Sequence, residues 1–232
     1  MQTVTGERER TGTSELERYV IAGLIFYFAS GTLAHTLPAV LPVTRYITDV
    51  LLFATNGVIL YTLYRQHRDR ALLTWLGLAY VFTFATEAVG VATGAVFGEY
   101  AYGATMWVQW LGVPFAIALN WCVLTLACND LSIRLLGPAG EKQFLLKSVL
   151  LALASSVLIA LYDVVIEPVA IALDYWTWAA VEIPLQNYLA WGVVAFIISL
   201  PLHLLRIRFT SPVLIVYLFA QLFFFAALNF LL

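Results

Sequence analysis

Long apolar runs fill most of this chain, and only short polar stretches separate them. Seven of the runs can each reach about 20 residues, the length that a helix needs to cross the hydrocarbon core of a bilayer. They lie near residues 19–41, 46–64, 71–95, 107–129, 144–167, 185–205 and 211–231. The pattern therefore predicts an all-α, polytopic membrane protein with seven transmembrane helices.

Prolines and polar residues set the expected boundaries. Pro184 and Pro212 stand where the sixth and seventh helices should begin, a position that suits proline. Pro38 and Pro42 are expected to close the first helix. The polar, mixed-charge opening is followed by an apolar segment without a small-residue cleavage site, which is not typical of a signal peptide. We expect residues 1–17 to be a disordered cytoplasmic tail and residues 18–232 to form a single transmembrane domain.

The basic residues predict an orientation. Eleven of the twelve lysines and arginines precede the first helix or lie in the connections between helices 2 and 3, 4 and 5, and 6 and 7, and only Arg45 lies on the other side. Cytoplasmic loops of membrane proteins carry the excess of Lys and Arg, so the N-terminus is expected inside the cell and the C-terminus outside. In this topology the polar groups of several helices converge on the outer half of the membrane.

Composition and missing motifs exclude several classes. Charged residues make up 11% of the chain, against about 25% in soluble proteins, and no basic cluster suits nucleic acid. Lys142 and Lys147 are both expected on the cytoplasmic side, which excludes a retinal Schiff base. Three scattered histidines cannot build a di-iron site, and no magnesium-binding acidic cluster, phosphate loop, nucleotide fingerprint or CxxC pair appears. We therefore expect neither a metal nor an organic cofactor.

Two carboxylates in the fifth expected helix are the first candidates for chemistry. Asp163 and Glu167 are four residues apart, which places them on one helix face. An acid at hydrocarbon depth is costly and by default functional. Two such groups cannot readily both ionise at low dielectric, so we expect one to stay protonated, as general acid–base catalysis requires. The alternative is that Glu167 is solvated at the interface, beside a Pro168 that ends the helix.

Glu87 and Asp49 complete the candidate catalytic acids. Glu87 lies towards the outer end of the third helix, and Gly90 and Gly94 follow it on the same face as a small-residue stripe that can let helices approach closely. A structural hydrogen bond to a neighbouring helix is its alternative role. Asp49 shares a face of the second helix with Asn56, and its alternative role is to cap that helix from the water side.

The candidate substrate-binding residues are uncharged. A lone histidine is more often an interface residue than a ligand, and aromatic residues at this level could simply form an interfacial belt. Their faces could otherwise stabilise a cationic centre. The candidates are His35, Tyr100, Asn120, Tyr175, Trp176, Trp178, Asn187 and Trp191.

A weak internal repeat relates the third and fourth expected helices to the fifth and sixth. In each copy an acid is followed by two aromatic residues two positions apart, then by a proline and, seven residues later, by a tryptophan. The members are Glu87, Tyr100, Tyr102, Pro114 and Trp121 in one copy and Asp163, Trp176, Trp178, Pro184 and Trp191 in the other. Both copies would run in the same direction, which makes a parallel repeat. Chance is the alternative explanation.

The ordered motifs between residues 87 and 191 resemble those of the CruF-type carotenoid hydratase family of integral membrane proteins. They are Glu87-x2-Gly90-x3-Gly94-x2-Phe97-Gly98-x-Tyr100-x-Tyr102, Gly112-Val113-Pro114 with Trp121, Asp163-x3-Glu167-Pro168-x-Ala170, Tyr175-Trp176-x-Trp178 and Pro184-x2-Asn187-Tyr188-x2-Trp191. The resemblance covers roughly half of the chain. The first, second and seventh expected helices match only in hydropathy and length.

The resemblance implies an enzyme that adds water across the 1,2 (1′,2′) double bond of an acyclic carotenoid end and gives a tertiary 1-hydroxyl. The implied substrates are acyclic or monocyclic C40 carotenoids, such as lycopene or γ-carotene, or the C50 bisanhydrobacterioruberin. Such a hydration needs a proton donor and a shielded cation, and we expect Asp163 to donate the proton. The other expected roles are a water-directing base for Glu167 or Glu87, water positioning for Asn187, and a cation-shielding wall for Trp176, Trp178 and Trp191.

Two functions of other classes use the same residues. A lycopene-type cyclase would let an alkene capture the cation in place of water, and a transporter or lipid-binding protein would use the acids as proton or cation ligands. The expected location is the cell membrane. The expected partners are a carotenoid within the bilayer, lipid, and other membrane enzymes of carotenoid synthesis, with no nucleic acid.

Overall fold

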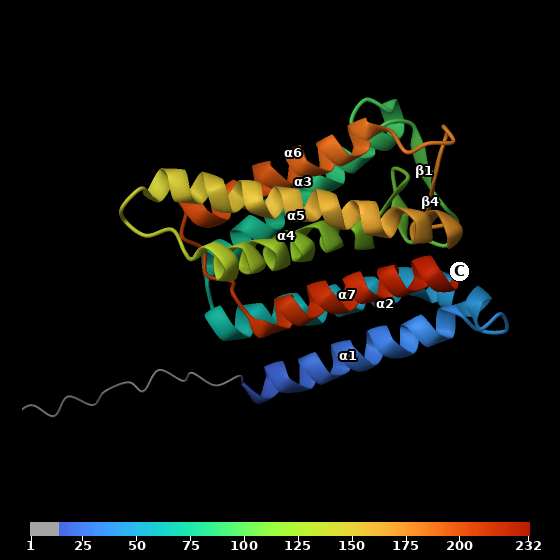
Figure 1. Ribbon diagram of the computed structural model, residues 1–232, viewed down its shortest axis with the longest axis horizontal. Coiled ribbons are helices and arrows are strands. Elements are labelled where there is room, and N and C mark those ends of the chain that lie inside the picture. The colour runs from blue at the N-terminus through green and yellow to red at the C-terminus, as the bar shows by residue number, and fades with distance from the viewer. Residues whose placement is uncertain (1–13) are drawn as a thin grey trace, which may run out of the picture.

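A computed structural model describes residues 14–232, so the predicted tail lies almost wholly outside the described residues. Seven helices and four short strands make up the fold (Figure 1). The helices are α1 Glu15–His35, α2 Leu41–His67, α3 Arg70–Thr93, α4 Phe115–Leu136, α5 Phe144–Ala172, α6 Leu185–Leu204 and α7 Pro212–Leu231. The strands are β1 Tyr100–Tyr102, β2 Gln109–Trp110, β3 Val113–Pro114 and β4 Trp176–Trp178. The prediction of a helical polytopic protein is correct at the level of fold class.

The first helix begins inside the range that was expected to be a tail. Ser14 and Glu17 form a capping box, in which each side chain accepts a hydrogen bond from the other residue's backbone N–H. Helices α2 to α7 are long and apolar enough to cross a membrane, whereas α1, which contains Arg18 and His35, does not meet the same criteria. Six of the seven expected spans are therefore supported.

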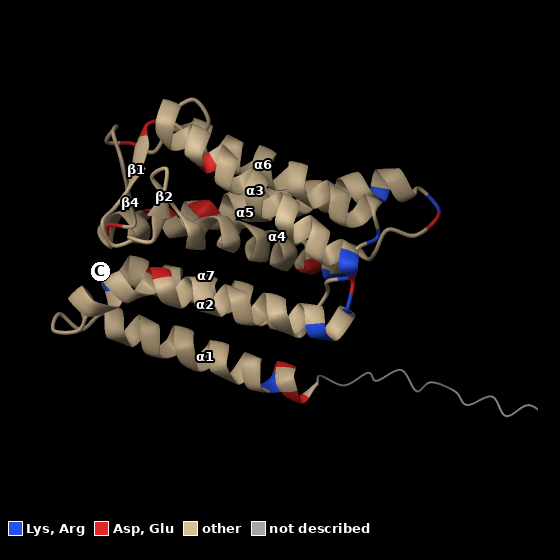
Figure 2. Ribbon diagram, turned by 180° about the vertical axis from the view of Figure 1, so that it is seen from behind, with Lys and Arg blue, Asp and Glu red and all other residues tan. Residues whose placement is uncertain are grey.

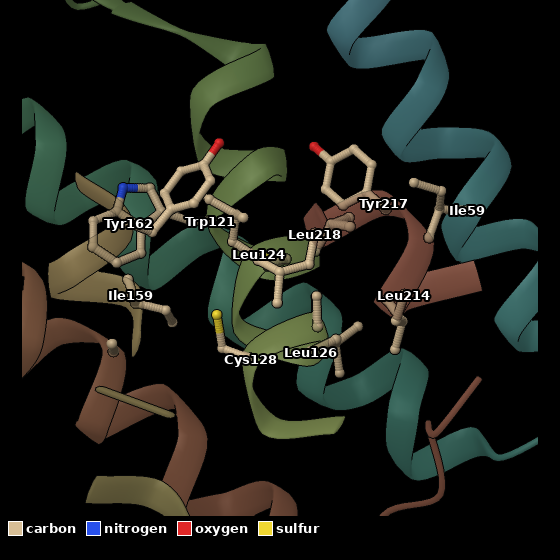
Figure 3. Close-up of a cluster of buried hydrophobic side chains, with 14 of the residues drawn as sticks. Ile59, Trp121, Leu124, Leu126, Cys128, Ile159, Tyr162, Leu214, Tyr217 and Leu218 are labelled. Atoms are coloured by element: carbon tan, nitrogen blue, oxygen red, sulfur yellow. The ribbon is translucent and has the colours of Figure 1, made fainter. Parts of the chain in front are cut away.

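The helices form two groups that lie against each other. In Figure 1, α1, α2 and α7 lie along one side of the molecule and α3, α5 and α6 along the other. Helix α4 lies between the groups and contacts α2, α3, α5, α6 and α7. Its central position explains why it is the most buried helix. Figure 3 shows part of the resulting core, with Ile59 of α2, Leu124 of α4, Ile159 of α5 and Leu214 of α7 converging.

Residues 107–114, expected to start the fourth helix, form a hairpin instead. Strands β2 and β3 pair antiparallel through a two-residue turn at Leu111 and Gly112, whose φ angles are 52° and 75°. Positive φ at both central residues is characteristic of a type I′ turn. Helix α4 starts only after Pro114 and runs seven residues beyond the expected end at residue 129.

Two proline assignments change, those of Pro42 and Pro168, and those of Pro184 and Pro212 agree with the expected helix starts. Pro42 stands in the first turn of α2 and does not close α1. Pro168 lies inside α5, which continues to Ala172, so Glu167 is within the helix and not beside its end. Pro184 is the N-cap of α6, and Pro212 opens α7 as expected.

The two ends of the bundle differ in charge. Figure 2 shows Lys and Arg gathered at the end away from the strands, which we call the basic end. The opposite end, where β1 to β4 lie, is called the strand end. Arg45 is the exception, because it pairs with Asp174 of the strand-end loop at 3.7 Å. This separation is the one that the charge pattern predicts, and the direction of insertion stays a prediction.

Candidate active site

A cavity of about 280 Å³ lies at the strand end, between the two helix groups. Its walls come from α1, α2, α4, α5, α6 and α7, with Glu87 of α3 and side chains of β1 and β4 completing it. Ten of the twelve predicted site residues line it, namely His35, Glu87, Tyr100, Asn120, Glu167, Tyr175, Trp176, Trp178, Asn187 and Trp191. Asp163 and Asp49 do not line it. Most of the residues selected from the sequence thus lie around one cavity, and their roles stay predictions.

Glu87 is held by three uncharged donors. The hydroxyls of Tyr100 and Tyr102 lie 2.5 and 2.9 Å from its Oε2 atom, and the indole N–H of Trp121 donates to Oε1 at 2.8 Å. The carboxyl is buried, and among the described residues no lysine or arginine pairs with it. The three hydrogen bonds stabilise the charged form of Glu87 and offset the free energy lost when its carboxylate leaves water.

Glu167 has a closely similar cradle. The indole N–H groups of Trp176 and Trp178 donate to its Oε2 atom at 3.0 Å each, and the Asn187 amide donates to Oε1 at 3.2 Å. Every one of these distances is longer than its counterpart at Glu87. Phenol O–H groups normally approach an acceptor more closely than indole N–H groups, so the longer distances from the two indoles to Glu167 reflect the type of donor.

The two-stranded sheet of β1 and β4 supplies four of these six donors. The strands pair antiparallel, with Tyr100 opposite Trp178 and Tyr102 opposite Trp176. Side chains two positions apart on a strand share a face, so both phenols and both indoles point the same way. The sheet presents its phenols to one glutamate and its indoles to the other.

Burial raises the pKa of both phenols in this sheet, and the nearby Glu87 carboxylate raises it further. Each shift favours the protonated phenol. Tyr100 and Tyr102 consequently remain hydrogen-bond donors as the pH rises through the range in which an exposed tyrosine ionises, near 10.

The contacts across the site follow the internal repeat. Trp121 and Trp191, the matched tryptophans of the two copies, stack with ring centroids 4.1 Å apart. The matched aromatic pairs of the two loops face each other across β1 and β4. Antiparallel pairing of matched strands is what a pseudo-twofold axis between two parallel copies would produce. The strands and tryptophans of the two copies thus face each other, and the repeat itself stays a prediction.

Asp163 lies behind Glu167. Its side chain is 0% exposed, its Oδ2 atom accepts a hydrogen bond from the Asn187 amide at 2.5 Å, and its Oδ1 atom has no partner. The same amide nitrogen donates to Glu167, so Asn187 bridges the two carboxyls. Asp163 cannot touch a molecule in the cavity, and both N–H bonds of Asn187 are already used.

Asp49 was expected either to act in catalysis or to cap α2, but it lies outside the cavity lining and inside that helix. It is buried in the third turn of α2, so it does not cap that helix, and its Oδ2 atom accepts a hydrogen bond from the backbone N–H of Val108 at 2.8 Å. The neighbouring Trp107 indole donates to the carbonyl of Tyr46 at 3.0 Å. Both hydrogen bonds hold the loop before β2 against α2.

Gly90 and Gly94 make room for the loop that follows α3, and not for the helix–helix contact that was expected. A Cβ atom on Gly90 would stand 2.8 Å from the Phe97 ring and 3.2 Å from the Tyr100 hydroxyl. Gly94 caps α3 in the left-handed conformation, with φ at 66°. The glycines thus let the chain turn back and bring Tyr100 onto Glu87.

Several lining residues were not among the predicted site residues. Trp121 could have been selected, because the repeat matches it to Trp191. Gln221 is a lone amide in the strongly apolar α7, and a polar residue in such a helix is itself a signal. Tyr162 gave no such signal, because its place on the cavity depends on how α5 packs against α7.

Among residues 14–232, no group of three or more His, Cys, Asp or Glu side chains is placed to hold a metal ion. The chemistry available in the cavity is that of carboxyl groups, neutral donors and aromatic faces. These groups can move a proton and stabilise a cation.

Comparison with known proteins agrees with this description. The family model described as "Carotenoid biosynthesis protein" matches residues 47–231. The bisanhydrobacterioruberin hydratase of Haloarcula japonica is 31% identical over 123 residues, which is 50% of this chain and 40% of that protein. The chain thus matches less than half the length of this relative. No solved structure matches.

These matches confirm the resemblance to CruF-type carotenoid hydratases that the motifs indicated. The family model covers most of the chain, including α3 to α7 and the whole wall of the cavity apart from α1 and the start of α2. The chain belongs to the carotenoid biosynthesis protein family.

Proposed function

We propose that this chain is a carotenoid hydratase that adds water across the terminal 1,2 (1′,2′) double bond of an acyclic carotenoid end. The observation that carries the proposal is the pair of glutamates, Glu87 and Glu167, facing one apolar cavity and held only by uncharged donors. Family membership and the name of the Haloarcula relative support the same chemistry.

The reaction is an acid-catalysed addition. A carboxylic acid gives its proton to C-2, the π electrons form the new C–H bond, and a tertiary cation develops at C-1. Water attacks C-1 and a carboxylate takes the proton that the water loses, so the net change is the addition of one water. The enzyme must supply one acid, one base and a surface that tolerates positive charge.

We assign proton delivery to the Asp163–Asn187–Glu167 group. A fully buried Asp163 with one amide donor and one unpartnered oxygen would be costly as an anion. Asp163 is therefore favoured as the neutral acid, and Glu167, the member that reaches the cavity, gives its own proton to the alkene. The N–H groups of Trp176, Trp178 and Asn187 hold the Glu167 carboxylate that this step leaves. From the sequence we expected Asp163 to donate the proton directly. In the revised proposal Glu167 is the donor, and Asp163 holds Asn187, which in turn bonds to Glu167.

Glu87 is the proposed base. Two phenols and an indole stabilise its charged form, and it lines the same cavity as Glu167. Asn187 was expected to position the water, but its two N–H bonds are used by the two carboxyls, which leaves only its carbonyl oxygen for that role. Water is instead held by Glu87 in this scheme, and Asn187 positions the acid pair.

The stacked indoles of Trp121 and Trp191 form the proposed wall for the cation, together with Trp176. Aromatic faces attract a cation within about 6 Å of the ring centroid and do so most strongly when water is excluded. They cannot capture the cation covalently as a carboxylate could. The wall therefore leaves water as the nucleophile.

The cavity accepts only the end of such a substrate. A carotenoid is about as long as the hydrocarbon core is thick, roughly 30 Å, far more than about 280 Å³ can enclose. The lining residues that are also exposed are Ser30 of α1 and Ile47 and Leu51 of α2. We propose that the polyene leaves the cavity between these two helices and lies in the lipid of the cell membrane.

Expression in a lycopene- or γ-carotene-producing host tests the proposal. The expected product is heavier by one water, and growth in heavy water should place deuterium at C-2. A cyclase would give a cyclic product of unchanged mass. A transporter or lipid-binding protein would leave the pigment unchanged, and transport would depend on an ion gradient. Unchanged pigments with both C40 and C50 acyclic substrates would refute the hydratase.

A further inference from the structure

A groove of about 350 Å³ lies between α3 and α6, and it shares no lining residue with the candidate active site. Its wall runs from residue 71 to residue 82 of α3 and from residue 197 to residue 205 of α6, and Ile207 completes it. The two helices lie in the same group (Figure 1), but α6 packs mainly against α5. Space therefore remains between α3 and α6.

The lining residues of this groove offer no free polar group. Only Thr74 and Trp75 have polar side-chain atoms, and these donate to backbone carbonyls of α3 and α6 at 3.2 and 2.8 Å. Leu78, Phe82 and Leu205 are exposed, so the groove is open to the medium around the bundle. Since that medium is lipid for a membrane-spanning helix, a hydrocarbon chain is the ligand that this wall fits.

The length of the groove matches one leaflet of a bilayer. Its lining residues extend about 16 Å along α3, at about 1.5 Å per residue. One leaflet contributes about 15 Å, half of a hydrocarbon core that is roughly 30 Å thick. Helix α3 begins at the basic end with Arg70, and the groove reaches the middle of that helix at Phe82. It therefore runs from the membrane surface towards the centre, as an acyl chain does.

Arginines surround the mouth of the groove. Arg70 directly precedes the first lining residue, and Arg206 stands between the last two, Leu205 and Ile207. Within residues 14–232 neither arginine forms an ion pair. The Arg206 guanidinium lies over the Phe144 ring, 4.6 Å from its centroid, which positions the group and leaves its charge in place.

The two connections that carry these arginines are tied together. The Asp69 carboxylate accepts a hydrogen bond from the backbone N–H of Arg208 at 3.2 Å, and the Arg208 guanidinium lies 3.9 Å from it. Residues 68–70 and 206–208 thus bring four arginines and one aspartate to one place. Basic pockets between transmembrane helices at a membrane surface bind anionic lipid headgroups.

We propose that the α3–α6 groove and the arginines at its mouth bind one anionic phospholipid of the leaflet at the basic end. An acyl chain fills the groove, and the headgroup phosphate lies between Arg70 and Arg206. The site is separate from the carotenoid cavity and does not depend on the proposed reaction.

The charges favour a lipid over a second copy of the chain as the occupant. Two copies in one membrane have the same orientation, so a twofold contact through this groove would bring both arginine clusters together. Like charges at close range oppose that contact, whereas an anionic phosphate is attracted to the same cluster.

The test compares two lipids with identical acyl chains. The full chain is purified in a neutral detergent, and its thermal unfolding is followed with added dioleoyl phosphatidylglycerol or dioleoyl phosphatidylcholine. At saturation the anionic lipid should raise the melting temperature by roughly 5 °C more than the zwitterionic one. Native mass spectrometry should retain one phosphatidylglycerol per chain. Equal shifts with the two lipids would overturn the proposal.

Paired substitutions locate the effect. Arg70→Gln combined with Arg206→Gln should remove the difference between the two lipids. Arg18→Gln combined with Arg65→Gln is the matched control, because it removes two exposed charges from α1 and α2 at the same end of the bundle. This control should keep the difference. An equal loss in both double variants would show a general attraction of the basic end for anions and would overturn the site.

Thr74→Phe tests the groove itself. The position is exposed, so a ring there fills the groove without entering the core, and every arginine is kept. The preference for phosphatidylglycerol and the retained lipid should both be lost. A preference that survives this change would place the lipid elsewhere and overturn the proposal. So would a lipid-insensitive dimer, measured by light scattering, that Thr74→Phe converts to a monomer, because a second copy would then cover the groove.

Discussion

At the scale of single residues, the sequence located the acids but not their partners. Glu87, Asp163 and Glu167 stand out because a carboxyl is rare in an apolar helix. Their donors depend on the register of two short strands, which places Tyr100 opposite Trp178, and no helical periodicity encodes that register. The difference between Asp163 and Glu167 was equally hidden, because one turn of α5 decides which of them reaches the cavity.

Replacement of each carboxyl tests the assignment of acid and base. Glu167→Gln and Glu87→Gln keep the shape of the side chain but cannot move a proton, and each should lower product formation at least about 100-fold. Asp163→Asn should also abolish or strongly reduce product while the protein still inserts, because it removes the carboxyl that Asn187 joins to Glu167. Carotenoid analysis of the expressing cells is the measurement.

The exposed Glu182 provides the control. Glu182→Gln should leave the product level unchanged, since this residue belongs to the loop before α6 and not to the cavity lining. Full activity in Glu167→Gln would remove its role as proton donor, and full activity in Glu87→Gln would do the same for the base.

At the scale of elements, hydropathy predicted the helices and missed the strands. The starts of α5, α6 and α7 agree with the expected ranges to within one residue. The segment 107–114 looked helical because it is apolar and aromatic, but Gly112 and Pro114 belong to a tight turn and a strand. Strands of two or three residues lie below the length at which alternation becomes visible.

Gly103 tests whether the β1–β4 sheet is required. A Cβ atom there would clash with the backbone oxygen of Asp174, and the Gly103 N–H bonds to the carbonyl of Tyr175 at 2.9 Å. Gly103→Ala should therefore push the strands apart, at a cost of about 1–3 kcal/mol for overpacking. A melting temperature lower by roughly 2–10 °C is expected for a chain of this size.

Thermal unfolding in detergent measures the effect, with Gly192→Ala as the matched control. A Cβ on Gly192 meets nothing within 4 Å, so that variant should melt no lower than the wild type. Product formation should fall in Gly103→Ala, because the four donors of the two glutamates move with the sheet. Unaltered stability and activity would show that the sheet tolerates the extra carbon and does not hold the site in place.

At the scale of the whole molecule, the repeat and the charge asymmetry explain where the site lies. The two copies meet at β1 and β4, and the tryptophans Trp121 and Trp191 stack between them. The acids that face the common cavity are Glu87 and Glu167, whereas the repeat matches Glu87 to Asp163. The basic residues are collected at the other end (Figure 2). The meeting of β1 with β4 was accessible from the sequence through the repeat, whereas the packing of α2 and α7 against α4 was not. It depends on hydrogen bonds from Asn56 and Tyr217 to Asn120, and no periodic pattern in the sequence pairs these residues.

Cysteine labelling tests the direction of insertion. Cys122 and Cys128 are both buried, so the native chain should react little with a membrane-impermeant maleimide. Val181→Cys places a thiol at the strand end, and Gly140→Cys places one in the loop between α4 and α5 at the basic end, where both positions are exposed. The excess of Lys and Arg at the basic end predicts that this end is cytoplasmic.

In intact cells Val181→Cys should therefore be labelled, and Gly140→Cys only after the cells are permeabilised. The unsubstituted chain controls for the two native thiols. If the pattern is reversed, the basic loops are outside and the charge rule does not hold for this chain. The cavity, which lies at the strand end, would then draw its substrate from the cytoplasmic leaflet and not from the outer one.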